Sequence, residues 1–89
     1  ELDVDALEIY NSRYFFGAAN EKARITALRN KITAVAGSDA HSAECVGLAT
    51  VEVEAEPEEE AVLRAIQEGN VRIKRCKRTP LWVYFTQLL

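Results

Sequence analysis

Short apolar runs, several of which alternate with polar positions, predict four β-strands along the chain. They cover residues 6–10, 32–36, 48–54 and 71–74. The second run is rich in β-branched residues and is bounded by Gly37, which is typical of a strand buried on both faces. In the third run, Val51 and Val53 alternate with glutamates, which predicts a half-buried strand at a sheet edge. The apolar segment 81–89 also has a strand-like pattern, but this pattern leaves its structure open.

Two longer segments have the spacing and the end signals of helices. Asn20 suits the N-cap of a first helix over residues 23–31. Its apolar positions are spaced to face a sheet, and they are Ile25, Leu28 and Ile32, with Ala23 and Ala27 beside them. Pro57 suits the first turn of a second helix and Gly69 suits its C-terminal end. The stripe expected to be buried on this helix consists of Ala61, Val62, Ala65 and Ile66.

The order of these elements predicts an α/β fold. Strand, helix and strand follow one another between residues 6 and 36, and such a unit is normally parallel and right-handed. This connection would place Asn11 and Asp39 at the same edge of the sheet. We expect residues 1–89 to form a single domain, with four to five strands in a mostly parallel or mixed sheet and two main helices.

The charge changes sign along the chain, although the net charge is only −3. Glutamates gather between residues 52 and 60, whereas residues 72–78 are rich in lysine and arginine. The overall acidity argues against a general nucleic-acid-binding role. The basic stretch could attract phosphate or nucleic acid, but a charged, solvated edge strand is the simpler explanation.

The remaining composition favours a cytoplasmic protein. Cys45 and Cys76 are too few for a disulfide scaffold, and we expect both to be reduced thiols. The apolar run 81–85 is far too short to span a bilayer, so no membrane partner is expected. The sequence contains no methionine, even at position 1, which leads us to expect an excised or processed segment of a longer protein.

The candidate chemistry follows the second predicted strand. If the backbone stays extended past Gly37, Asp39 and His41 project to the same side of the strand's C-terminal end. A carboxylate beside an imidazole makes half of a transition-metal or zinc site, and His41 is the only histidine of the chain. Ser38 lies between Gly37 and this pair. It is a candidate for supporting the ligands or contacting the substrate.

Each candidate also has a structural explanation. Aspartates such as Asp39, next to Gly and Ser, often form Asx-turns or helix caps, and a lone His41 could be purely structural. Glu8 could reach the site from the sheet or face solvent, and Asn11 could support the ligands or only form a turn. Cys45 could be a soft ligand, although a buried small hydrophobic residue is the stronger interpretation.

Three segments resemble a known family. They are D-A-L-E-I-Y-N at 5–11, A-G-S-D-A-H at 36–41 and V-G-L-A-T at 46–50. In this order they resemble the C-terminal part of the PHP (polymerase and histidinol phosphatase) superfamily of metal-dependent phosphoesterases. The resemblance covers roughly residues 5–75.

The resemblance implies a segment of a distorted (β/α)₇ barrel that holds up to three divalent metal ions. These ions activate a hydroxide that hydrolyses phosphate esters. Carried onto this chain, the last ligand pair of the family falls on Asp39 and His41, whereas the N-terminal H-x-H and the other ligands have no counterpart here. An Asp and His pair accepts zinc, manganese or iron.

The sequence is consistent with two main functions. The first is the C-terminal portion of a metal-dependent phosphoesterase that acts on a phosphate-ester substrate as part of the full-length protein and is inactive alone. The second is a non-catalytic α/β interaction module that self-associates, as a homodimer, through the apolar end around Trp82 and Phe85. Binding of nucleic acid by the basic stretch ranks third. A cut barrel also exposes sheet edges, so we expect either a compact sandwich or dimerisation through those edges.

Overall fold

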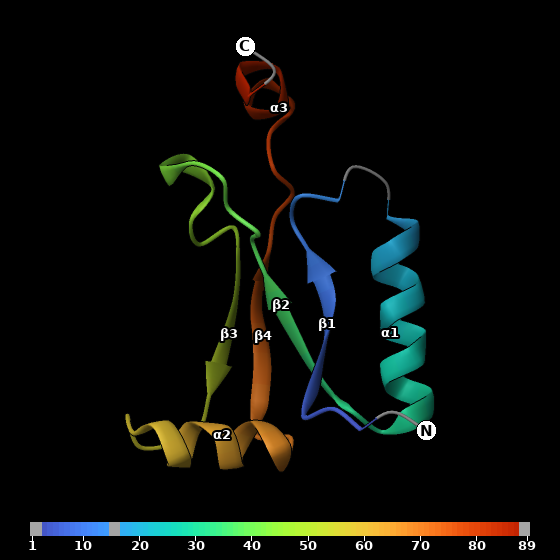
Figure 1. The fold of residues 1–89 in the computed structure, drawn as a ribbon, viewed down its shortest axis with the longest axis vertical. Coiled ribbons are helices and arrows are strands. Elements are labelled where there is room, and N and C mark those ends of the chain that lie inside the picture. The colour runs from blue at the N-terminus through green and yellow to red at the C-terminus, as the bar shows by residue number, and fades with distance from the viewer. Residues whose placement is uncertain (1–2, 15–16, 88–89) are drawn as a thin grey trace.

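The computed structural model describes residues 3–14 and 17–87, in which strands and helices alternate (Figure 1). The elements are β1 (Ala6–Asn11), α1 (Ala18–Asn30), β2 (Thr33–Gly37), the 3₁₀ turn η1 (Ala43–Cys45), β3 (Ala49–Val53), α2 (Glu59–Gln67), β4 (Val71–Cys76) and α3 (Leu81–Gln87). The four strands and the two main helices that the sequence predicts are all present. Their order confirms a small mixed α/β fold.

The strands form two separate pairs. β1 and β2 are parallel, and their register runs from Ala6 opposite Thr33 to Asn11 opposite Gly37. β3 and β4 are antiparallel. The predicted parallel strand, helix, strand unit is therefore present, but the predicted single sheet of four to five strands is not confirmed, because the described residues form two sheets of two strands each. β2 lies against β3 and β4 without a ladder of hydrogen bonds to either.

Isolated hydrogen bonds connect the β1 and β2 pair to α2 at one end and to the segment after β4 at the other. At one end, the Thr33 hydroxyl donates to the Ile66 carbonyl of α2 at 2.6 Å. At the other end, the Ser12 amide donates to the Gly37 carbonyl at 3.1 Å, and the Thr79 amide donates to the Ser12 carbonyl at 2.8 Å. Ser12 therefore connects the ends of β1 and β2 to the segment that leads from β4 into α3.

Helix α1 faces β1 through the small residues of the predicted face rather than through its large ones. The prediction is wrong for the two large residues within the helix, because Leu28 is 67% exposed and Ile25 is 38% exposed. The buried residue is Ala27, with Ala23 half-buried on the same side. Asn20 lies in the first helical turn on this side and is not the N-cap, which is Gly17. Its side chain bonds to the end of β1, and this contact sets the rotation of the helix.

Helix α2 matches its predicted stripe and its predicted end. It begins at Glu59, two residues after Pro57, and Ala65 is its buried residue. Gly69 has φ of 82°, and its amide donates to the Ile66 carbonyl while the Asn70 amide donates to the Ala65 carbonyl. This pair of bonds is a Schellman motif, which requires the left-handed conformation that glycine adopts at low cost.

The apolar C-terminal segment is helical up to Gln87, and its strand-like pattern is misleading. Val83 of α3 has no exposed surface, and Tyr84 beside it is half-buried. Neighbouring inward positions fit a helix that contacts the domain on one side, whereas a strand would alternate. Pro80 accepts a bond from the Val83 amide at 3.1 Å and introduces the helix. Residues 88 and 89, which the strand-like pattern also covers, lie outside the described residues.

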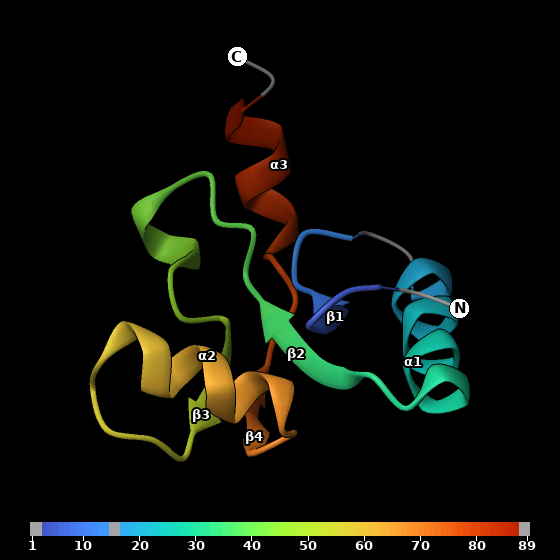
Figure 2. The same ribbon diagram turned by 60° about the horizontal axis from the view of Figure 1, so that its bottom comes forward.

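The molecule is open for its length. The Cα radius of gyration is 14.3 Å, compared with about 12 Å for a compact chain of this size. β2 is only half-buried along its whole length, which contradicts the expectation of burial on both faces. Figure 2 shows α2 across one end of the strands and α3 extending from the other. The buried residues are mostly small, so much of the sheet surface remains accessible.

Candidate functional site

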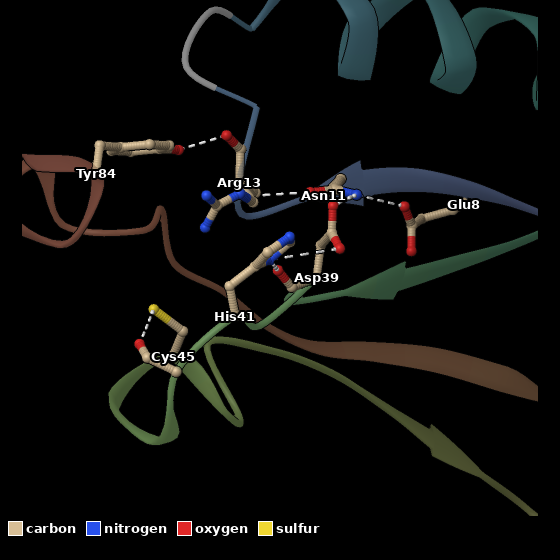
Figure 3. A network of polar contacts seen from close by, with 8 residues as sticks. Glu8, Asn11, Arg13, Asp39, His41, Cys45 and Tyr84 are labelled. Carbon is tan, nitrogen blue, oxygen red and sulfur yellow. Dashed lines mark hydrogen bonds and ion pairs between the residues drawn. The ribbon is translucent and has the colours of Figure 1, made fainter. Parts of the chain in front are cut away.

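The candidate site lies at the C-terminal ends of β1 and β2 (Figure 3). Asn11 ends β1 and is 7% exposed. Its side-chain amide nitrogen donates to Glu8 Oε1 at 3.0 Å and to Asp39 Oδ2 at 3.3 Å. Its side-chain oxygen accepts a bond from the Arg13 amide at 2.9 Å. Asn11 therefore connects both candidate carboxylates and also closes the turn after β1.

The backbone of Asn11 is fixed from α1. Its amide donates to Asn20 Oδ1 at 2.9 Å, and its carbonyl accepts from Asn20 Nδ2 at 3.3 Å. This reciprocal pair satisfies both backbone groups at the point where β1 ends. The first turn of α1 thus holds the strand end that carries the site.

Glu8 belongs to this group because β1 is irregular. In a regular strand, residues three apart point to opposite faces. Between Glu8 and Tyr10 the register shifts by one residue, so Ile9 is an extra residue in the strand. The shift turns Glu8 towards the Asn11 side chain. An ideal Cβ at Gly37 would lie 2.7 Å from Glu8 Oε2, so the glycine leaves the space that the carboxylate occupies.

Asp39 and His41 lie close together, although the backbone does not stay extended. The strand ends at Gly37, and Asp39 has φ of 49°, in the left-handed region that aspartate tolerates better than most residues. The extended path that the sequence suggests is therefore wrong. The turn nevertheless leaves His41 Nδ1 at 4.0 Å from Asp39 Oδ1 and at 2.8 Å from the Asp39 carbonyl oxygen.

The contact with the carbonyl selects one tautomer of the neutral imidazole. A carbonyl oxygen only accepts hydrogen bonds, so Nδ1 of His41 must carry the proton in this contact. In the neutral ring, Nε2 then has the free lone pair. The side chains of His41 and Asp39 are 50% and 46% exposed, so the pair can be approached from solvent.

The other predicted candidates are less closely connected. Ser38 is half-buried, and among the described residues no hydrogen bond joins it to Asn11, Asp39 or His41. Cys45 is 1% exposed in η1, where the Ser42 hydroxyl lies 3.6 Å from its sulfur. It behaves as a buried small side chain. Both cysteines are free thiols, and Cys76 is exposed.

Two residues of this region escaped the sequence analysis. The Tyr84 hydroxyl of α3 donates to the Arg13 carbonyl, and the Arg13 guanidinium carbon lies 5.3 Å from the centre of the Tyr84 ring. These residues are 71 positions apart in the chain. Because the pattern of residues 81–89 leaves the structure of this segment open, nothing in the sequence links Tyr84 to the site.

The donor atoms gathered at this strand end are those of one carboxylate and one imidazole, with Glu8 on the other side of Asn11. Within residues 3–14 and 17–87, no three His, Cys, Asp or Glu side chains are grouped closely enough to hold a metal ion. Both side chains of the pair are oriented by hydrogen bonds, because His41 Nδ1 contacts a carbonyl and Asp39 accepts a bond from Asn11. Such outer hydrogen bonds orient the ligands of protein metal sites.

Comparison with known proteins identifies the family. A family model described as PHP-associated matches residues 17–71, which is more than half of the chain. The chain belongs to the PHP-associated family. No curated protein and no solved structure matches it. The match confirms the resemblance to a C-terminal segment of PHP proteins.

The matched range of this PHP-associated segment contains Asp39 and His41 but not the whole site. Glu8, Asn11 and Arg13 precede it, and α3 follows it. In the described part of the segment, no helix is long and apolar enough to cross a membrane. The cytoplasmic location stays a prediction.

Proposed function

We propose that this PHP-associated segment supplies Asp39 and His41 as metal ligands to a phosphoesterase, whose remaining ligands lie outside the segment. One observation gives this proposal its strongest support. The Nδ1–H of His41 donates to the Asp39 carbonyl, which presents Nε2 for a metal ion in the arrangement common to metal-binding histidines. The divalent ion, zinc, manganese or iron, would supply an activated water and neutralise charge on the phosphate ester.

The position of the pair supports this proposal. Both residues follow the C-terminal end of a parallel strand, where α/β folds commonly place their chemistry. Asn11 holds Asp39 Oδ2, so the other oxygen is the one available to an ion. Two protein ligands alone bind an ion weakly, so we expect the 89-residue chain by itself to be inactive.

The test uses the longest natural form of the protein that contains this segment. The metal-loaded protein is expected to hydrolyse p-nitrophenyl phosphate and to lose this activity in a chelator. Asp39→Asn and His41→Asn should lower activity by more than the roughly 10–100-fold that loss of an outer hydrogen-bond partner costs. Asparagine tolerates the left-handed backbone at residue 39, so the first variant removes charge without adding strain.

A matched control is available in the next turn. Glu44 is an exposed carboxylate in η1, and Glu44→Gln should leave activity unchanged. If the variants of residues 39 and 41 are as active as Glu44→Gln, the metal-ligand proposal is wrong.

A second function is favoured by the exposed side of α3. Leu81, Trp82 and Phe85 are 54%, 53% and 66% exposed on one short helix. Clustered apolar side chains of this kind mark association surfaces. If the segment self-associates there, a Trp82→Ser, Phe85→Ser double variant should convert a dimer into a monomer in light scattering. A monomeric parent protein would eliminate this alternative.

A further inference from the structure

Helix α3 presents an apolar surface at one end of the molecule. Its exposed apolar residues share one side of the helix, and they are Leu81, Trp82 and Phe85. Val83, on the opposite side, is fully buried and holds the helix against the domain. Two exposed cations, Arg75 and Lys77, come shortly before the helix, at the end of β4. This α3 surface therefore combines apolar side chains with positive charge.

The opposite end of the molecule carries a groove of complementary chemistry along α2 (Figure 1). The groove has a volume of about 470 Å³ and is mostly apolar, and it is lined by Pro57, Glu58, Glu59, Val62, Leu63 and Ile66. Leu63 is 46% exposed, so it is available to a partner's apolar side chain. Both lining glutamates are exposed and belong to the acidic stretch 52–60. The α2 groove thus combines apolar side chains with negative charge.

We infer that the α3 surface of one copy of this chain occupies the α2 groove of a second copy. The inference rests on the self-association proposed above for α3 and adds the surface that receives the helix. Amphipathic helices commonly bind protein grooves through apolar residues one turn apart, as Leu81 and Phe85 are. Opposite charges beside the apolar contact favour this pairing over a contact between two α3 surfaces, which would bring like charges together.

Two copies can make this contact twice. The groove and the α3 surface belong to helices at opposite ends of the strands, along the longest extent of the molecule, which is 42 Å (Figures 1 and 2). In an antiparallel pair, each α3 therefore meets the α2 of the other copy, and all four surfaces are covered. Closed two-fold pairs are the commonest protein oligomers, so we expect a dimer.

Two variants of the longest natural form break the contact from opposite sides. The Trp82→Ser, Phe85→Ser variant removes apolar side chains of α3. Leu63→Arg places a cation in the groove, where it repels the positive α3 surface. Each variant should lose about thirtyfold in affinity for each of the two contacts, as for a hot-spot residue, and should be a monomer where the parent is a dimer. Leu28→Arg, at an exposed leucine of α1 outside the groove, is the matched control and should remain a dimer.

Mixing the two monomeric variants tests the pairing of the surfaces directly. The Leu63→Arg protein keeps an intact α3 surface, and the double variant keeps an intact α2 groove. An equimolar mixture should therefore form a heterodimer through one remaining contact, about thirtyfold weaker than the parent dimer, which analytical ultracentrifugation detects. Circular dichroism identifies variants that fail to fold. Added salt should weaken the parent dimer, because it screens the charges beside the contact.

Three results would overturn the inference. They are a monomeric parent protein, a Leu63→Arg variant that stays dimeric like Leu28→Arg, and two folded monomeric variants that do not combine on mixing. A monomeric parent eliminates self-association altogether. A dimeric Leu63→Arg variant leaves self-association through α3 in place and rejects only the α2 groove as its partner.

Discussion

The Asn11 side-chain nitrogen lies 3.3 Å from Asp39 Oδ2, which joins the end of β1 to the loop after β2 across 28 residues of sequence. The same nitrogen donates to Glu8. One amide therefore reduces the repulsion between two carboxylates and fixes the orientation of the one proposed to bind metal.

Replacing Asn11 with alanine should destabilise the fold by roughly 1–3 kcal/mol, because a nearly buried side chain with three hydrogen bonds is lost and the Arg13 amide loses its acceptor. Urea unfolding followed by circular dichroism measures the change. The control is Asn30→Ala at the exposed end of α1, where the asparagine bonds only to the Thr26 carbonyl among the contacts described. Equal effects of the two substitutions would contradict the central place given to Asn11.

Gly37→Ala should displace the Glu8 carboxylate, since the new Cβ would lie 2.7 Å from Glu8 Oε2. The carboxylate is the end of a flexible side chain, so we expect a small loss of stability together with loss of the Glu8 to Asn11 bond. In a Glu8→Ala background the same glycine substitution should cost less, and a double-mutant cycle measures this coupling. Gly17→Ala, which would meet no atom within 4 Å, should show no coupling to Glu8. Purely additive effects at residues 8 and 37 would refute the close contact.

Val83→Ala should weaken the attachment of α3. Val83 has no exposed surface, and removal of its two methyl groups is expected to cost about 2 kcal/mol. Because Trp82 lies on the same helix, its fluorescence should report detachment at lower urea concentration than the circular dichroism of the sheets. Leu81→Ala, at an exposed position of α3, should have little effect. If Val83→Ala behaves like Leu81→Ala, α3 does not depend on this contact.

The β3 and β4 pair should lose stability in acid through Glu52. The hydrogen bond from Arg72, assisted by the charge of Lys74, lowers the pKa of Glu52. A lowered pKa in the folded state adds stability that is present above the unfolded pKa and is lost as pH falls through the folded value. Glu52→Gln should therefore show a smaller decrease of the urea midpoint between pH 6 and pH 3. This range extends about one pH unit or more to each side of the usual carboxyl pKa. Identical pH slopes in the two proteins would contradict this assignment.

Local signals in the sequence were sufficient for most elements. The alternation of Val51 and Val53 with glutamates and the glycine at residue 69 each depend on neighbours within one element, and both match the structure. The rotation of α1 could not be predicted in this way. It depends on Asn20 bonding to the backbone of Asn11, and the apolar Leu28 gave a misleading signal.

The candidate site also combines features that can be predicted from the order of the elements with features that depend on residues far apart in the sequence. The proximity of Asn11 and Asp39 follows from the parallel unit that the sequence predicts. The inclusion of Glu8 depends on an extra residue in β1, and the contact of Tyr84 with Arg13 depends on where α3 packs. Neither feature has a periodic signature. For the same reason, the pairing of the strands into two sheets could not be predicted from the strand patterns alone.

The central claim is that Asp39 and His41 bind a divalent ion. Paramagnetic broadening by a small amount of Mn²⁺, measured by NMR on the ¹⁵N-labelled 89-residue chain, tests it most directly, because it detects even a weak ion site. If these residues bind the ion, the broadening of amide signals is centred on residues 36–42 and around Asn11, and it is lost in an Asp39→Asn, His41→Asn double variant. Broadening that persists in the double variant, or that is centred instead on the acidic residues 54–60, would contradict the account.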